Sequence, residues 1–98
     1  MNVILTCAGR RNYLVKFFQE ALGSRGKVFA GDATLEAPTL QEADESFLLP
    51  PINHSDYFEK LLDICQQKQI RLLIPMNDLE LPYLAKQLYR FLKIGTIP

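Results

Sequence analysis

The chain has no excess of charge of either sign, because its 98 residues include 11 Lys or Arg and 11 Asp or Glu. A strongly basic balance is typical of proteins that bind nucleic acids or anionic membranes. The composition therefore predicts neither nucleic acid nor membrane as a partner. No run approaches the ~20 consecutive apolar residues of a membrane span, and residues 1–6 are too short for a secretory signal. We expect a small cytoplasmic domain.

Histidine and cysteine are scarce. His54 is the only histidine, Cys7 and Cys65 are the only cysteines, and no metal-type spacing links them. We therefore predict no metal site. Cys7 follows an expected strand, and a thiol at a helix N-terminus can be a nucleophile because that position lowers its pKa. No base accompanies it, so the favoured interpretation of both thiols is small buried side chains.

The glycine patterns of nucleotide-binding loops are also missing. A dinucleotide fingerprint needs three glycines around a tight turn, whereas residues 7–12 contain only Gly9. No Gly-Lys-Ser or Gly-Lys-Thr occurs, so a phosphate-binding loop of the Walker type is excluded. The cofactor half of a dehydrogenase or sugar-nucleotide enzyme is therefore the weakest of the functions considered.

What the chain does contain is an alternation of apolar strands and amphipathic helices. The expected strands span residues 2–6, 27–31, 46–49 and 70–75, and helices follow the first, third and fourth of them. The apolar positions expected to face the core are Tyr13, Leu14, Phe17, Phe18, Ala21 and Leu22 in the first helix and Leu84, Leu88, Phe91 and Leu92 in the last. Residues 96–98 have the pattern of a further strand entrance. The order predicts an α/β, three-layer Rossmann-like domain with a parallel sheet of about four to five strands.

The order of these strands in the sheet stays open between the Rossmann and flavodoxin patterns. In both, ligands bind at the carboxyl ends of the strands, where the strand order reverses. We expect that point between strands 2–6 and 70–75, so the turns that follow them should face each other. The expected substrate-binding residues are Gly9, Arg10, Arg11, Asn77, Asp78 and Glu80. Cations and helix N–H groups opposite carboxylates suit a small substrate that carries an anionic group and a cationic or hydroxyl group.

Each of these residues also has a purely structural interpretation. Asp78 could cap the last helix, and Glu80 could only complement the dipole of its first turn. Arg10 and Arg11 could be solvated surface charges. Asp32, at the end of the second strand, could bind a ribose, although a role in capping its loop is favoured.

Four motifs occur in a characteristic order. They are Ile4–Arg11, Gly31–Asp32, Glu42–Asp44 and Leu73–Leu81. Together they resemble the N-terminal, pre-ATP-grasp domain of ATP-grasp ligases, and in particular bacterial proteins similar to the carbamoyl-phosphate synthase large chain. The resemblance covers essentially all 98 residues. It implies ATP-dependent joining of a carboxylate to an amine through an acyl-phosphate, with the loops at 9–11 and 78–80 facing the substrate.

The family holds ATP and Mg²⁺ in two later domains, and the lysines and acidic cluster of those domains are missing from this sequence. Phosphoryl transfer depends on such groups, so residues 1–98 alone should need no cofactor and be inactive. We expect a fragment of a longer ligase whose ATP-grasp domains lie in cis or on a partner subunit, with an apolar docking patch that lets the isolated chain self-associate. The alternative is a stand-alone α/β module that binds a small anion or nucleotide.

Overall fold

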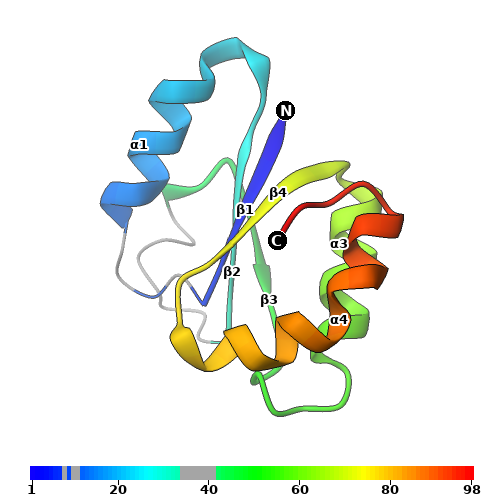
Figure 1. Cartoon of the computed structure of the whole chain (residues 1–98). Coiled ribbons are helices and arrows are strands. Elements are labelled where there is room, and N and C mark those ends of the chain that lie inside the picture. Colours follow the sequence, from blue (N-terminus) through cyan, green and yellow to red (C-terminus); the bar gives the residue numbers. More distant parts are fainter. Residues whose placement is uncertain (8, 10–11, 34–41) are drawn as a thin grey trace.

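The computed structural model describes residues 1–7, 9, 12–33 and 42–98 (Figure 1). The strands are β1 (Asn2–Thr6), β2 (Val28–Asp32), β3 (Glu45–Leu48) and β4 (Ile70–Pro75). The helices are α1 (Asn12–Leu22), α3 (Tyr57–Gln67) and α4 (Leu81–Lys93), with short 3-10 turns η1 (Gly23–Arg25) and η2 (Asp78–Glu80). The predicted strands are confirmed to within one residue at each end.

The four strands form one parallel sheet in the order β3-β2-β1-β4. This is the Rossmann order, and it reverses between β1 and β4, where the sequence predicted the switch point. Beyond β4, Ile97 forms a parallel bridge with Leu72, and its amide and carbonyl bond to Arg71 and Leu73, each at 2.8 Å. The predicted α/β fold with a parallel sheet of four to five strands is confirmed.

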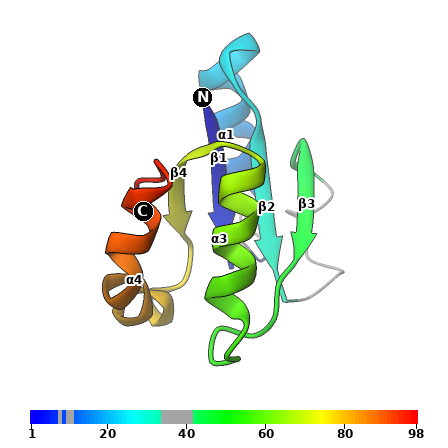
Figure 2. The ribbon, with the colours of Figure 1, turned by 90° about the vertical axis from the view of Figure 1, so that its right-hand side faces the viewer.

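Helices cover both faces of the sheet. Figure 1 shows α1 on one side and α3 and α4 on the other, and Figure 2 shows α3 and α4 together on the face nearer the viewer. Along β1, Val3 and Leu5 pack in the core beneath α1, whereas Ile4 belongs to the core beneath α3 and α4. Strand periodicity sends alternate side chains to opposite faces, so a strand covered on both is apolar at consecutive positions. No described helix is long and apolar enough to cross a membrane.

The buried face of α1 is narrower than its apolar pattern predicted. Tyr13 and Phe17 are 66% and 61% exposed and Ala21 is exposed as well, so the assignment of these three residues to the core was wrong. The packed stripe consists of Leu14, Val15, Phe18 and Leu22. Val15 lies at the centre of this stripe, and the stripe's three- and four-residue spacing turns positions 13 and 17 toward solvent.

The same correction applies to α4. Leu84 and Phe91 are buried, as predicted, but Leu88 and Leu92 are 44% and 49% exposed. Residues 84 and 91 are two turns apart and lie on one line along the helix, beside the partly buried Ile94. Leu88 and Leu92 lie farther around the helix, so α4 presents apolar side chains both to the core and to its outer surface.

Candidate functional site

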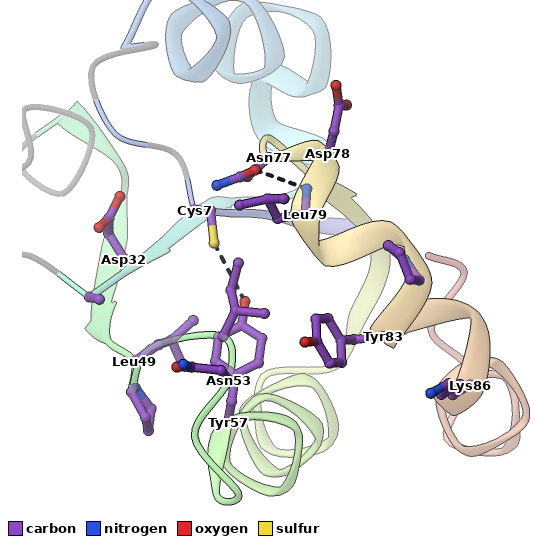
Figure 3. A pocket seen from close by; sticks show the side chains of 14 residues that line it. Cys7, Asp32, Leu49, Asn53, Tyr57, Asn77, Asp78, Leu79, Tyr83 and Lys86 are labelled. Carbon is purple, nitrogen blue, oxygen red and sulfur yellow. Dashed lines mark hydrogen bonds between the residues drawn. The ribbon is translucent and has the colours of Figure 1, made fainter.

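A pocket of about 820 Å³ opens at the carboxyl edge of the sheet (Figure 3). Its walls come from the segments that follow all four strands. They are Cys7 after β1, Asp32 and Ala33 at the end of β2, Leu49, Pro50, Ile52 and Asn53 after β3, Asn77, Asp78 and Leu79 after β4, with Tyr57 of α3 and Pro82, Tyr83 and Lys86 of α4. The pocket therefore lies at the topological switch point, where doubly wound sheets bind their ligands.

The turn after β1 is held against β2. Cys7 and Gly9 have φ values of 52° and 57°, in the left-handed region that a residue other than glycine adopts only when its surroundings hold it there. The amide of Gly9 donates a 2.7 Å hydrogen bond to Oδ2 of Asp32. Asp32 thus joins the turn after β1 to the end of β2, and its predicted role in capping its own loop stays a prediction. Arg10 and Arg11 lie outside the described residues, and their predicted role stays a prediction.

Glu80 is fully buried beneath the pocket, with 0% of its surface exposed. Its Oε2 accepts a 2.8 Å hydrogen bond from the hydroxyl of Thr6, and its Oε1 accepts from the Cys7 thiol at 3.1 Å. The hydroxyl of Tyr57, in the first turn of α3, also donates to Oε1. One carboxylate therefore joins the end of β1, the turn after it, α3 and η2. The prediction that Glu80 contacts substrate stays untested.

This arrangement keeps both acidic neighbours of Glu80 protonated at neutral pH. Burial raises the pKa of Cys7 to about 12, and the nearby Glu80 carboxylate adds to the effect. The pKa of Tyr57 is also raised, first by burial and then by Glu80. A thiol with such a pKa is a poor nucleophile. Cys7 is half-buried rather than buried, and its raised pKa favours the interpretation of a weakly nucleophilic thiol over that of a catalytic cysteine.

The loop after β4 forms the opposite wall. Asn77 is extended, at φ −128° and ψ 124°, and its Oδ1 accepts a 2.9 Å hydrogen bond from the amide of Leu79. Asn77 thus caps η2, the 3-10 turn that precedes α4. The N-cap position of α4 itself is Glu80, whose side chain forms no capping hydrogen bond, so the interpretation of Asp78 as the cap of the last helix was wrong. Asp78 and Asn77 both line the pocket. Among the described residues, no group of three or more His, Cys, Asp or Glu side chains could hold a metal ion.

Several pocket residues were not identified from the sequence. Asn53, Tyr57, Tyr83 and Lys86 line the pocket, and Figure 3 shows the Tyr57 hydroxyl facing the Cys7 sulfur, 3.8 Å away. Tyr57 and Tyr83 lie in the first turns of helices that begin at the carboxyl edge of the sheet. That position is a usable signal for both tyrosines, although Tyr57 is also a core residue with 1% of its surface exposed. The structure brings Asn77 and Asp78 into the pocket wall with Asp32, the partner of Gly9, and places Glu80 underneath.

Comparison with known proteins identifies the domain type. The family model "PylC-like, N-terminal domain" matches residues 3–98. Glycinamide-RNase-transformylase T from Mycobacterium tuberculosis superposes with a TM-score of 0.71 at 18% identity, over 99% of this chain and 28% of that one. The NAD complex of dTDP-glucose 4,6-dehydratase from Bacillus anthracis str. Ames gives a TM-score of 0.52 at 13% identity, over 96% and 32%.

Both solved structures share the fold with this chain, and at these identities they show the fold alone. The chain spans less than a third of the length of either one. No curated protein matches it significantly in sequence. The family match over residues 3–98 is therefore the comparison that bears on function.

Proposed function

The chain belongs to the family of PylC-like N-terminal domains, and on this premise we propose that it is the substrate-side domain of an ATP-dependent carboxylate–amine ligase. The resemblance to the pre-ATP-grasp domain of ATP-grasp ligases is confirmed at the level of domain type. The family match across residues 3–98 is the observation that carries the proposal. Similarity to carbamoyl-phosphate synthase in substrate or reaction detail is part of the proposal.

The reaction implied by the family joins two small molecules at the expense of ATP. The γ-phosphoryl group of ATP is transferred to a carboxylate, which gives an acyl-phosphate and ADP. The amine nitrogen then attacks the acyl carbon, the amine loses a proton and phosphate leaves. We propose that this chain binds a substrate and excludes water, while ATP and Mg²⁺ are held by the ATP-grasp domains.

We assign substrate contact to the two turns at the switch point. Asn77 and Asp78 line the pocket, and the turn that contains Gly9, Arg10 and Arg11 follows Cys7, another lining residue. A cationic turn opposite an acidic loop suits a substrate with both an anionic and a cationic or hydroxyl group. The pocket volume of about 820 Å³ lies within the ~300–1,000 Å³ usual for small-molecule sites.

We further propose that the ATP-grasp domains, in cis or on a partner subunit, cover the exposed apolar side chains of α1 and α4. Tyr13 and Phe17 on α1 and Leu88, Tyr89 and Leu92 on α4 are exposed. Exposed apolar clusters of this kind mark docking surfaces. Self-association of the isolated chain through the same residues would support this proposal. A cytoplasmic location fits the two free thiols.

The test is ATP-dependent ligation by the full-length gene product. ADP release should require one carboxylate and one amine together, and Asp78→Asn should raise the KM of one of them by about tenfold or more. Full activity of a gene product limited to residues 1–98, with no partner subunit, would contradict the proposal.

The second candidate is a stand-alone binding module, which is favoured by a pocket lined by this chain's own residues. Calorimetry of residues 1–98 with ATP, inorganic phosphate and amino acids separates the two candidates. Micromolar binding of ATP or phosphate would favour the module. The dehydrogenase alternative gains only a shared fold from the dehydratase, because Asp32, the position that would meet a ribose, accepts a hydrogen bond from Gly9.

A further inference from the structure

The hydrogen bonds around Glu80 determine where three protons lie. A carboxylate has acceptor capacity only, whereas a hydroxyl or thiol can both donate and accept. The hydroxyls of Thr6 and Tyr57 and the thiol of Cys7 all converge on the two oxygens of Glu80. Each of these groups has a single proton, and each must direct it to the carboxylate.

Two of these three donors line the pocket. With their protons turned down toward Glu80, the Tyr57 oxygen and the Cys7 sulfur can present only lone pairs to a ligand above them. The Cys7 sulfur lies 3.8 Å from the Tyr57 oxygen and closer, 3.1 Å, to Oε1 of Glu80. We call these two groups, Cys7 Sγ and Tyr57 OH, the pocket floor.

The charge of Glu80 acts in the same direction. Its three partners are neutral, and none of the ion pairs among the described residues involves it. A buried charge that has no counter-ion in the described part of the chain is screened weakly, so its field reaches the adjacent cavity. A cation above the floor is therefore attracted, and an anion is repelled.

We infer that Glu80 is a positioning residue that makes the pocket floor a receptor for a hydrogen-bond donor, so that the amine substrate, as a primary amine or ammonium group, binds over Cys7 and Tyr57. This deepens the proposed function and depends on it for the identity of the bound group. The carboxylate and its phosphoryl donor must then lie toward the mouth of the pocket. Glu80 itself touches no substrate, because the floor separates it from the cavity.

The electrostatic effect of Glu80 on the pocket floor can be measured at Cys7 without any substrate. Methanethiosulfonate reagents with an aminoethyl or a sulfonatoethyl group transfer a cationic or an anionic label to the same sulfur. The ratio of the rate constants for the cationic and the anionic reagent should be about tenfold higher for Cys7 than for the free thiol 2-mercaptoethanol. Glu80→Gln should reduce this preference to about threefold or less, and peptide mass mapping separates Cys7 from Cys65.

The matched control removes an equal charge from the opposite edge of the sheet. Asp44 accepts a hydrogen bond from the amide of Val28 at the amino end of β2, so Asp44→Asn should leave the reagent preference of Cys7 unchanged. A preference that is absent in the unmodified protein, or that persists fully in folded Glu80→Gln, would overturn the inference. A lowered pKa of Cys7 in Glu80→Gln speeds both reagents equally and cancels in their ratio.

Recognition of a hydrogen-bond donor by the pocket floor is tested by NMR. Two probes of equal length, n-butylammonium and n-butanoate, are titrated into ¹⁵N-labelled protein, and the amide chemical shifts are followed. Butylammonium should shift the amides around Cys7 and Tyr57, and butanoate should not. Tyr57→Phe retains the ring and Glu80 but removes one acceptor from the floor, so it should weaken butylammonium binding by about threefold or more. Absence of butylammonium shifts, or stronger shifts by butanoate at the floor, would refute donor recognition even if Glu80→Gln does not fold.

The outcomes of these measurements distinguish failure of the inference about the pocket floor from failure of the proposed function. If Cys7 shows the expected reagent preference but the full-length protein releases no ADP with any carboxylate and amine, the floor is as inferred and the ligase assignment is wrong. If ligation occurs but Glu80→Gln alters the KM of the carboxylate and not that of the amine, the ligase assignment holds and the floor does not receive the amine.

Discussion

The two edges of the sheet differ in the hydrogen-bond partners of their polar side chains. At the amino edge, side chains bond to the main chain. Asn2 donates to the Lys68 carbonyl at 2.7 Å and accepts from the Lys27 amide at 3.0 Å, and Asp44 accepts from the Val28 amide at 2.8 Å. At the carboxyl edge, Asp32 and Asn77 likewise accept from main-chain amides, but the side chains around Glu80 bond to one another.

The difference separates hydrogen bonds that any strand end requires from a side-chain network that, in our proposal, orients a binding site. Bonds to the main chain satisfy groups that every strand end exposes, so they are needed whatever the protein does. A buried carboxylate with three side-chain donors satisfies no main-chain group, and its burial costs free energy that only those donors offset. The network at the carboxyl edge orients the floor of the pocket, whereas the amino edge holds strands in register.

The largest effect that would sharpen this comparison is expected from Glu80→Ala. The change leaves three buried donors without an acceptor and creates a cavity, so the free energy of unfolding should fall by about 3 kcal/mol or more. Urea unfolding followed by circular dichroism measures the loss. Glu59→Ala removes an exposed carboxylate of α3 and should leave the unfolding midpoint nearly unchanged. Equal effects of both variants would mean that the Glu80 network contributes no stability.

The next effect is a loss of stability in alkaline solution. Burial raises the pKa of Cys7 and of Cys65 from 9.0 to about 12. Because the unfolded thiols ionise first, the stabilisation is complete below pH 9 and is lost progressively as the pH rises from 9 toward 12. The free energy of unfolding, measured from pH 7 to 11, should be flat and then decline.

A double variant provides the control for this alkaline decline. Cys7→Ser with Cys65→Ala removes both thiols, so the part of the slope that begins near pH 9 should become shallower while the stability at pH 7 shifts by a constant. The decline would remain in part, since the pKa of Tyr57 is also raised. An unchanged slope would show that neither thiol is as strongly protonated in the folded state as its burial implies.

The smallest effect is expected at the amino edge. Asn2→Ala removes two hydrogen bonds to the main chain near solvent and should lower the free energy of unfolding by about 1–2 kcal/mol. The charge preference of Cys7 for thiol reagents should not change, because the variant lies at the far end of β1. If Asn2→Ala alters that preference as much as Glu80→Gln does, the two edges are not independent and the comparison breaks down.

The sequence predicted the architecture better than the surfaces. Continuous apolar runs at residues 2–6 and 70–75 implied strands that are covered on both faces, and alternation with helices implied a parallel sheet with its switch point between them. The helix faces were harder. An apolar residue such as Phe17 or Leu88 fits the helical pattern of a core residue, but whether a neighbour covers it depends on elements from elsewhere in the chain.

The sequence predicted where the candidate site lies but identified only some of the residues that line the pocket. The turn after β1 and the loop after β4 were expected to face each other, and Cys7 and Asn77 do line one pocket. Local sequence offered Asp78 as the cap of the last helix, but Asn77 caps the 3-10 turn η2, and α4 begins after Glu80 without a side-chain cap. Tyr83 was missed because its helical position alone does not show that it faces a cavity.

Sequence alone determined the order of the elements, the parallel sheet and the edge of the sheet at which the pocket opens, since these follow from periodicity and from the handedness of the connections. Only the tertiary structure decided that Glu80 is buried and which groups donate hydrogen bonds to it. Its donors, Thr6 and Cys7, lie 74 and 73 positions away, and Tyr57 lies 23 positions away. An acid residue at the start of a helix is exposed by default, and it becomes a buried acceptor only where folding brings distant donors to meet it.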